Sequence, residues 1–193
     1  MTNDIHTLPA GTVILTYGRG RPELYNWWQW RYWQERGKNI LYGAIRAYQK
    51  HLGYSRIGAT HVRVIMEPGV FAEATTPKVR IGSTTELAGK RVAVCTPLHT
   101  YDVVMAIAWW RSWIGTSYDI AELLDFALSG LKGWISRRLG VLDRVDRFTC
   151  SPYAAGGFNA GGFPLDKDWR SITPAYYENK SQLFRVWYFT VPS

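Results

Sequence analysis

Hydrophobic and polar positions follow two different periods along the chain. In the first half, short apolar runs rich in β-branched residues are separated by turn residues, a pattern typical of β-strands. The pattern predicts strands over residues 8–17, 58–66, 70–75, 77–81 and 91–94. A further alternating run near the C-terminus, Phe184–Thr190, predicts a closing strand.

Between these strands, apolar residues recur at helical spacing. Residues 22–52 predict two helical pieces, residues 103–114 a helix ended by Gly115, and Ile120–Leu131 a helix with Asp119 as its N-cap. Strands first, helices in the middle and a closing strand predict an α+β fold, with helices packed on an antiparallel sheet. With 193 residues, 47% of them hydrophobic, and no linker, the chain is expected to form one domain over residues 1–193.

Composition and charge bear on where the protein is made and on what it binds. No apolar run reaches the roughly 18 residues of a membrane span, and the first four residues lack the pattern of a signal peptide. We therefore expect synthesis in the cytoplasm, and the site of action stays open. The net charge of +8 favours an anionic polymer or a membrane surface as partner, without choosing between them. Nothing in the sequence indicates the oligomeric state.

The stretch Trp27–Trp33 interleaves tryptophans with an arginine and a tyrosine. Such a stretch could bind sugars, a lipid interface or bases. The alternative is a helix packed through its aromatic face, with the charged ends of its side chains reaching solvent.

Cys150 stands at the predicted start of a helix. Thr149 can cap that helix, and Pro152 is tolerated in its first turn. The free N–H groups and the helix dipole would favour the thiolate, and the same N–H groups could receive an oxyanion. The alternative is a buried, inert cysteine, which is what we expect of Cys95 within its alternating strand.

Glu67-Pro-Gly69 predicts a tight hairpin between the strands on either side of it. Residues whose numbers sum to about 135 or 136 would lie opposite one another, so His61 faces the neighbourhood of Glu73 or Ala74. A carboxylate there could fix the tautomer of the imidazole and stabilise the imidazolium. Alternatively, His61 is an ordinary strand-end residue and Glu73 pairs with Arg63 or Lys78.

Short motifs along most of the chain resemble those of a known family, outside about residues 20–39 and 130–146. The motifs are Leu8–Gly11, Ala59–Ile65, Val70–Ala74, Gly115–Asp119, Thr149–Tyr153 and Ile172–Tyr177 followed by Phe184–Val186. Together they resemble the circularly permuted papain-like fold of the YiiX and YaeF-like amidases. These are related to NlpC-type cell-wall peptidases and to lecithin:retinol acyltransferase.

The resemblance implies a catalytic set. Cys150 would be the nucleophile, with Ser151 beside it in the family's Cys-Ser pair, His61 the general base and Glu73 the residue that orients the histidine. Tyr118 would lie near the site and help position the reacting carbonyl. The chain departs from the family pattern at Thr12, where the family has an acidic residue, and at Arg63, where it often has glycine. Arg63 would narrow or charge the cleft.

We therefore expect a cysteine hydrolase that cleaves amide bonds without metal or cofactor, acting on bacterial cell-wall peptides. One alternative is a lipid amide or ester hydrolase or an acyltransferase, and another is a non-catalytic binding or assembly module. Nucleic acid is the least favoured partner, because none of the expected binding motifs is found.

The glycines of the stretch Gly156–Gly162 would leave room for substrate or form flexible loop ends.

Overall fold

A computed structural model describes residues 4–17, 45–46, 49–56, 58–119 and 148–193. The Trp27–Trp33 stretch, the predicted helix Ile120–Leu131 and most of the predicted helical segment 22–52 lie outside these residues. Within that segment, residues 45–46 and 49–51 are helical.

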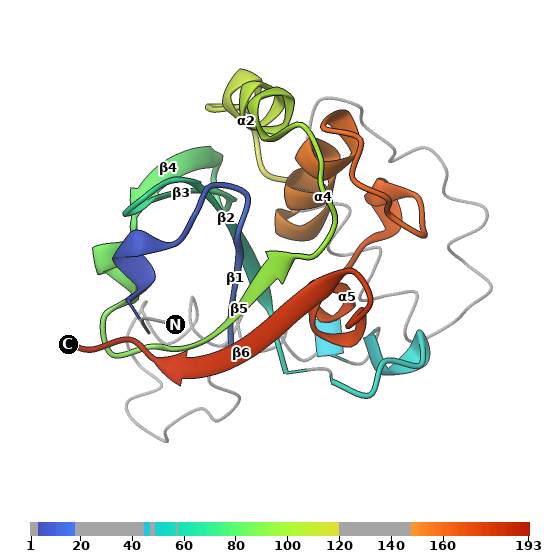
Figure 1. The fold of residues 1–193 in the computed structure, drawn as a ribbon, viewed down its shortest axis with the longest axis horizontal. Coiled ribbons are helices and arrows are strands. Elements are labelled where there is room, and N and C mark those ends of the chain that lie inside the picture. Colours follow the sequence, from blue (N-terminus) through green and yellow to red (C-terminus); the bar gives the residue numbers. More distant parts are fainter. Residues whose placement is uncertain (1–3, 18–44, 47–48, 57, 120–147) are drawn as a thin grey trace, which may run out of the picture.

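A six-stranded antiparallel sheet forms the centre of the described fold (Figure 1). Its strands lie in the order β4-β3-β2-β1-β5-β6, and every neighbouring pair is antiparallel. The strands are β1 (Val13–Thr16), β2 (His61–Glu67), β3 (Val70–Ala74), β4 (Val79–Ser83), β5 (Arg91–Pro97) and β6 (Phe184–Thr190). The predicted α+β class, with helices on an antiparallel sheet, is confirmed at this level.

The strand boundaries follow local chemistry. β4 begins at Val79 instead of Pro77, because proline has no N–H for the ladder and Lys78 pairs with Ser117 outside the sheet. The predicted turn between β4 and β5 contains a short 3₁₀ helix, η2 (Thr84–Leu87). Ser83 and Glu86 cap it reciprocally, which gives this connection a fixed geometry.

Side-chain alternation gives the sheet two apolar faces. One face contributes Val13, Leu15, Val62, Val64 and Ala93 to a cluster that also contains Cys150 and Tyr153. The other contributes a second cluster, closed by the N-terminal 3₁₀ helix η1 (Ile5–Thr7): Ile14, Ile65, Phe71, Val92 and Val94. Burial of these β-branched and aromatic side chains on both faces is the main force holding the strands together.

Helices cover the first face. They are α2 (Val103–Ser112), α4 (Cys150–Ala160) and α5 (Pro174–Asn179), and Figure 1 shows α2 beside α4 and α5 against β6. Two hydrogen bonds join α2 and α4: Trp110 Nε1 donates to the carbonyl of Ala154 at 3.1 Å, and Tyr153 Oη donates to the carbonyl of Trp110 at 2.8 Å. No helix in the described ranges is long and apolar enough to cross a membrane.

Two glycines inside α4 allow α2 to approach this closely. A Cβ atom added at Gly157 would lie 2.1 Å from Trp110 Nε1, and one added at Gly156 would lie 2.2 Å from Trp109 Cη2. The prediction that these glycines leave room for substrate or form loop ends is therefore wrong for both positions. They are helical, and the indole rings of α2 fill the space.

This packing predicts that Gly157→Ala destabilises the protein. Alanine in a helix interior is normally better than glycine by about 1 kcal/mol. Here the clash with the indole of Trp110 should outweigh that gain and lower the free energy of unfolding by about 1–3 kcal/mol. Urea denaturation measures the change. Asn159→Ala, at an exposed position of the same helix, is the control and should stay within about 0.5 kcal/mol of wild type. A Gly157→Ala protein as stable as wild type would contradict the packing argument.

Candidate active site

The nucleophile candidate lies at the start of a helix, as the sequence predicts. Cys150 is the first residue of α4, Thr149 is its N-cap in an extended conformation, and the cysteine side chain is buried. The Thr149 side chain does not form the capping hydrogen bond, so only its N-cap position was predicted correctly. Pro152 has no N–H, which leaves the N–H groups of Cys150 and Ser151 as the open donors of the first turn. Neither has a backbone partner in the described part of the chain.

The β2–β3 hairpin brings the predicted histidine and glutamate together. Its register pairs Val64 with Ala72 and Ile65 with Phe71. Continued along the hairpin, this register places Glu73 opposite Arg63 and diagonal to His61, so the three side chains share one face of the sheet. His61 Nε2 lies 2.6 Å from Glu73 Oε2. The predicted His61–Glu73 contact is therefore present.

Two arginines hold the same carboxylate. Arg63 Nε lies 2.8 Å from Glu73 Oε2, and Arg80 Nε donates to Glu73 Oε1 at 2.8 Å. Arg80 is the β4 residue directly opposite Glu73. The ion pair with Arg63, considered from the sequence as an alternative to the histidine contact, therefore coexists with it. The alternative pair with Lys78 is replaced by Arg80, which the sequence analysis missed.

These contacts keep Glu73 ionised. Glu73 is 1% exposed, and burial alone would raise its pKa. The hydrogen bond and charge of His61 and the charges of Arg63 and Arg80 outweigh burial and lower the pKa of Glu73 to about 2. At neutral pH the residue next to His61 is a carboxylate.

Arg63 is fixed on the sheet face that carries Glu73. Its Nη1 donates to Thr16 Oγ1 at 2.9 Å, and its guanidinium carbon lies 5.2 Å from the ring centre of Phe71. Burial lowers the pKa of Arg63, and the charge of Glu73 opposes that change. The charge of Arg63 is thus paired with the orienting carboxylate.

Cys150 and His61 act on each other electrostatically. Burial raises the pKa of the Cys150 thiol, but the charge of His61, a hydrogen bond with its ring and the N–H of Val62 outweigh it, so the net pKa is lowered. Burial and the charge of Arg63 lower the pKa of His61, but the charge of Cys150 and the hydrogen bonds with Cys150 and Glu73 together outweigh them, and the net pKa is raised. Because Nε2 is engaged by Glu73, Nδ1 is the ring nitrogen left for the thiol. These shifts favour a thiolate–imidazolium pair.

The two remaining predicted residues lie beside the start of α4. Ser151 is buried, its Oγ is 3.9 Å from Cys150 Sγ, and its carbonyl accepts a hydrogen bond from Tyr177 Oη at 3.2 Å. Tyr118 forms a backbone bridge with Phe148, two residues before the cysteine, and packs against the cluster that contains Cys150. Its role toward a reacting carbonyl stays a prediction.

Aromatic side chains surround this end of α4. The Phe148 ring centre lies 4.8 Å from that of Trp113, 5.5 Å from that of Trp109 and 6.2 Å from that of Trp169. Arg170 stacks on Trp169, with its guanidinium carbon 4.3 Å from the ring centre. The sequence analysis placed its aromatic surface at Trp27–Trp33 and missed this one, whose signal was the pair of tryptophans at helical spacing, Trp109 and Trp113.

The second cysteine is a core residue, as predicted. Cys95 is fully buried in β5, and burial raises the pKa of its thiol well above the ordinary value. Among the residues that the structure describes, no group of three His, Cys, Asp or Glu side chains could hold a metal ion.

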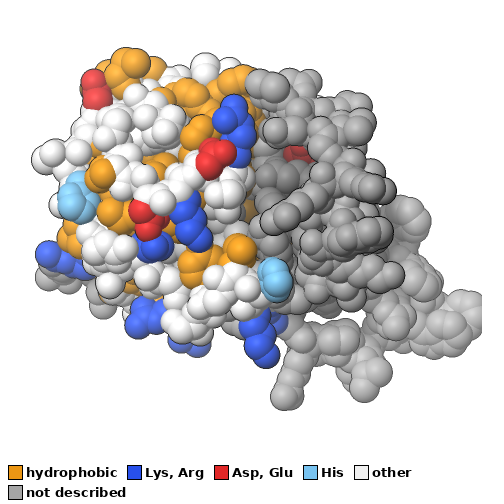
Figure 2. All heavy atoms as spheres, turned by 90° about the vertical axis from the view of Figure 1, so that its right-hand side faces the viewer, with side chains coloured by type: hydrophobic (Ala, Val, Ile, Leu, Met, Phe, Trp, Pro, Cys, Tyr) orange, Lys and Arg blue, Asp and Glu red, His pale blue; other side chains and the backbone are white. Residues whose placement is uncertain are grey.

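Figure 2 shows the basic side chains on one face of the molecule. In the described part of this face, Lys and Arg lie in small groups, and some lie beside acidic side chains. The overall charge of +8 is therefore not gathered into one continuous basic patch on this part of the surface.

No protein-family model matches the chain, and no curated protein is significantly similar to it. The assignment of function therefore rests on the geometry of Cys150, His61 and Glu73.

Proposed function

We propose that the protein is a cysteine hydrolase that cleaves amide bonds by acyl transfer. One observation carries the proposal: a buried thiol of lowered pKa at a helix N-terminus is coupled to His61, whose Nε2 lies 2.6 Å from an ionised, buried Glu73. Nucleophile, base and orienting group in hydrogen-bonding sequence are the requirement for covalent catalysis by a thiol.

Acylation begins with the Cys150 thiolate. Its sulfur attacks the carbonyl carbon, and the N–H groups of Cys150 and Ser151 stabilise the negative charge that develops on the carbonyl oxygen. The imidazolium of His61 gives its proton to the amide nitrogen, the C–N bond breaks and the amine leaves. The product on the enzyme is a thioester at Cys150.

Deacylation reverses the role of the histidine. Neutral His61 takes a proton from water as the water oxygen attacks the thioester carbonyl. The C–S bond breaks, a carboxylic acid leaves, and the thiolate–imidazolium pair is restored. Glu73 holds the ring throughout and stabilises its positive charge.

We further propose that the fold is papain-like in circularly permuted order. Support comes from the arrangement of the elements: β2 and β3 carry the histidine and the carboxylate and precede the cysteine helix α4 in the chain. His61 is the first residue of β2, Glu73 lies on the neighbouring strand β3, and Cys150 is the first residue of α4.

The proposed substrate is a bacterial cell-wall peptide. Net positive charge supports association with an anionic wall polymer, and the aromatic cluster around Phe148 offers apolar contact next to the thiol. The alternative hypothesis, a lipid amide or ester as substrate, is supported by the stretch Trp27–Trp33, which lies outside the described residues.

The experiment compares the two substrates directly. Purified protein should release free amines from peptidoglycan sacculi, Cys150→Ala should abolish the release, and added salt should weaken binding. Amide-lipid vesicles should be hydrolysed no faster than the Cys150→Ala background. Hydrolysis of vesicles with intact sacculi would replace the peptide proposal by the lipid one. Inactivity on both would favour a binding or assembly module.

A further inference from the structure

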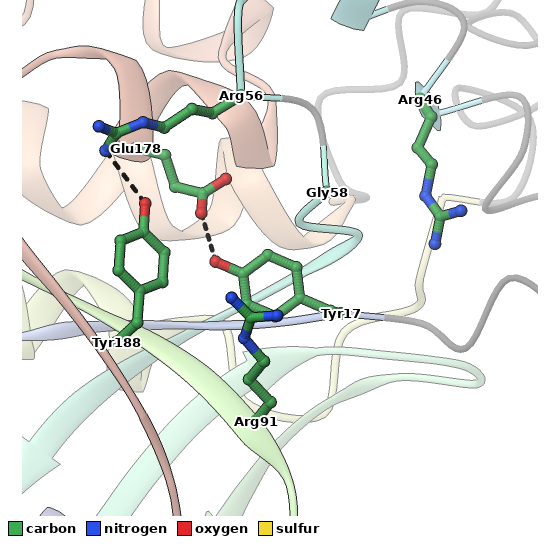
Figure 3. A pocket seen from close by; sticks show the side chains of 7 residues that line it. All are labelled: Tyr17, Arg46, Arg56, Gly58, Arg91, Glu178 and Tyr188. Atoms are coloured by element: carbon green, nitrogen blue, oxygen red, sulfur yellow. Dashed lines mark hydrogen bonds between the residues drawn. The ribbon is translucent and has the colours of Figure 1, made fainter.

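A pocket of about 550 Å³ lies beyond the end of β1 (Figure 3). Its volume falls within the range of small-molecule sites. Arginines and tyrosines supply most of its wall, and a single carboxylate lies among them. The lining residues are Tyr17, Arg46, Arg56, Gly58, Arg91, Glu178 and Tyr188.

Three of the lining residues lie close in the chain to residues at or next to the proposed site. Tyr17 directly follows Thr16, the partner of His61 in the β1–β2 pair. Gly58 precedes His61 by three residues, so their Cα atoms are at most about 11 Å apart. Glu178 follows Tyr177, whose Oη donates to the carbonyl of Ser151.

The carboxylate of the pocket is incompletely paired. Glu178 is 4% exposed, and its Oε1 accepts a hydrogen bond from Tyr17 Oη. Its Oε2 is buried and has no hydrogen-bond partner among the residues described. Burial, followed by the hydrogen bond with Glu178, raises the pKa of Tyr17, so this tyrosine remains a protonated donor. A buried carboxylate oxygen without a donor is unfavourable and indicates a ligand with a donor group.

Two of the arginines flank this carboxylate. Arg56 Nη1 donates to Tyr188 Oη at 3.1 Å, and the Arg91 guanidinium carbon lies 5.8 Å from the ring centre of Tyr17. Figure 3 shows both guanidinium groups flanking the Tyr17–Glu178 pair. Each keeps N–H groups that can form bidentate bonds with a carboxylate.

The two kinds of charge select the ligand. A simple cation would be repelled by the three arginines, and a simple anion would leave Glu178 Oε2 without a donor. A zwitterion satisfies both. We propose that this pocket binds an α-amino-acid head group, with its ammonium on Glu178 Oε2 and its carboxylate on Arg56 and Arg91. On the basis of the proposed function, that head group belongs to a residue of the peptide substrate whose side chain ends in a free α-amino acid, because a peptide N-terminus lacks the carboxylate and a peptide C-terminus lacks the ammonium.

The test measures binding of alanine to the Cys150→Ala protein by calorimetry. Alanine should bind, while N-acetylalanine, which lacks the ammonium, and alanine amide, which lacks the carboxylate, should each bind at least about 10-fold more weakly. Glu178→Gln and the exposed Arg91→Gln should each weaken alanine binding about 10-fold or more. Arg111→Gln, at an exposed position of α2, is the matched control and should bind alanine like the parent protein.

Several outcomes would overturn the inference. If inorganic phosphate binds and alanine does not, the pocket is an anion site. If neither Glu178→Gln nor Arg91→Gln changes the affinity for alanine, alanine binds elsewhere on the protein. Alanine that binds without competing with the peptide substrate would mark a site for the free amino acid. The rate at which iodoacetamide labels Cys150 in the wild-type protein tests the proposed nucleophile independently of the pocket. A reactive thiol without alanine binding refutes only the pocket, and alanine binding with an unreactive thiol refutes only the hydrolase.

Discussion

Glu73→Gln is expected to lower turnover of the amide substrate by about 10- to 10,000-fold in a folded protein. An amide can still hold the ring of His61, but it carries no negative charge to stabilise the imidazolium. The environment sharpens this effect, because the buried Arg63 would then lie near the histidine without its carboxylate partner. Steady-state kinetics on the wild-type and variant proteins measures the change.

Glu86→Gln is the matched control. Glu86 is the second carboxylate partner of Arg80, at 2.6 Å, and does not contact His61. Glutamine preserves the capping box of η2, so the fold should be retained. Turnover should stay within about threefold of wild type, because exposed ion pairs contribute little. Unchanged turnover in a folded Glu73→Gln protein would remove Glu73 from the catalytic set.

Stability in acid should also depend on Glu73. Its pKa is lowered from 4.5 to about 2 in the folded protein, so the unfolded chain takes up a proton first as the pH falls. The stabilisation is fully present above pH 4.5 and is lost as the pH falls toward 2. A shift of this size corresponds to about 3 kcal/mol in the free energy of unfolding.

Glu73→Gln provides the comparison, because glutamine cannot titrate. Urea denaturation at pH 5, 4, 3 and 2 should show the wild-type protein more stable than the variant by about 3 kcal/mol at pH 5, with the difference vanishing near pH 2. Titration of the other carboxylates occurs in both proteins and largely cancels. A difference that does not change with pH would show that the carboxylate is not held by charge.

The parts of the candidate site that could be predicted are those formed by residues close to one another in the sequence. The turn at Glu67-Pro-Gly69 pairs β2 with β3, and their register, which shifts between Ile65 and Glu67, puts Glu73 diagonal to His61. The start of α4 is likewise local, because Thr149 and Pro152 mark it. Both predictions depend on backbone rules that operate over a few residues.

Other features needed the folded chain. The contact between Tyr17 and Glu178 joins residues 161 positions apart, and no local pattern brings them together. The glycines of α4 resembled loop or cleft residues until the indole of Trp110 was seen to occupy the space above Gly157. Arg80 reaches Glu73 across a second hairpin whose register depends on where β4 begins. Long-range packing decides each of these contacts.

Alkylation by iodoacetamide tests the central claim most directly. At pH 6 to 7, intact-protein and peptide mass spectrometry should show that Cys150 reacts much faster than Cys95, because His61 favours the thiolate at Cys150 whereas burial suppresses it at Cys95. His61→Ala should slow the labelling of Cys150 at this pH. Equal labelling of both cysteines, or preferential labelling of Cys95, would contradict the assignment of Cys150 as nucleophile.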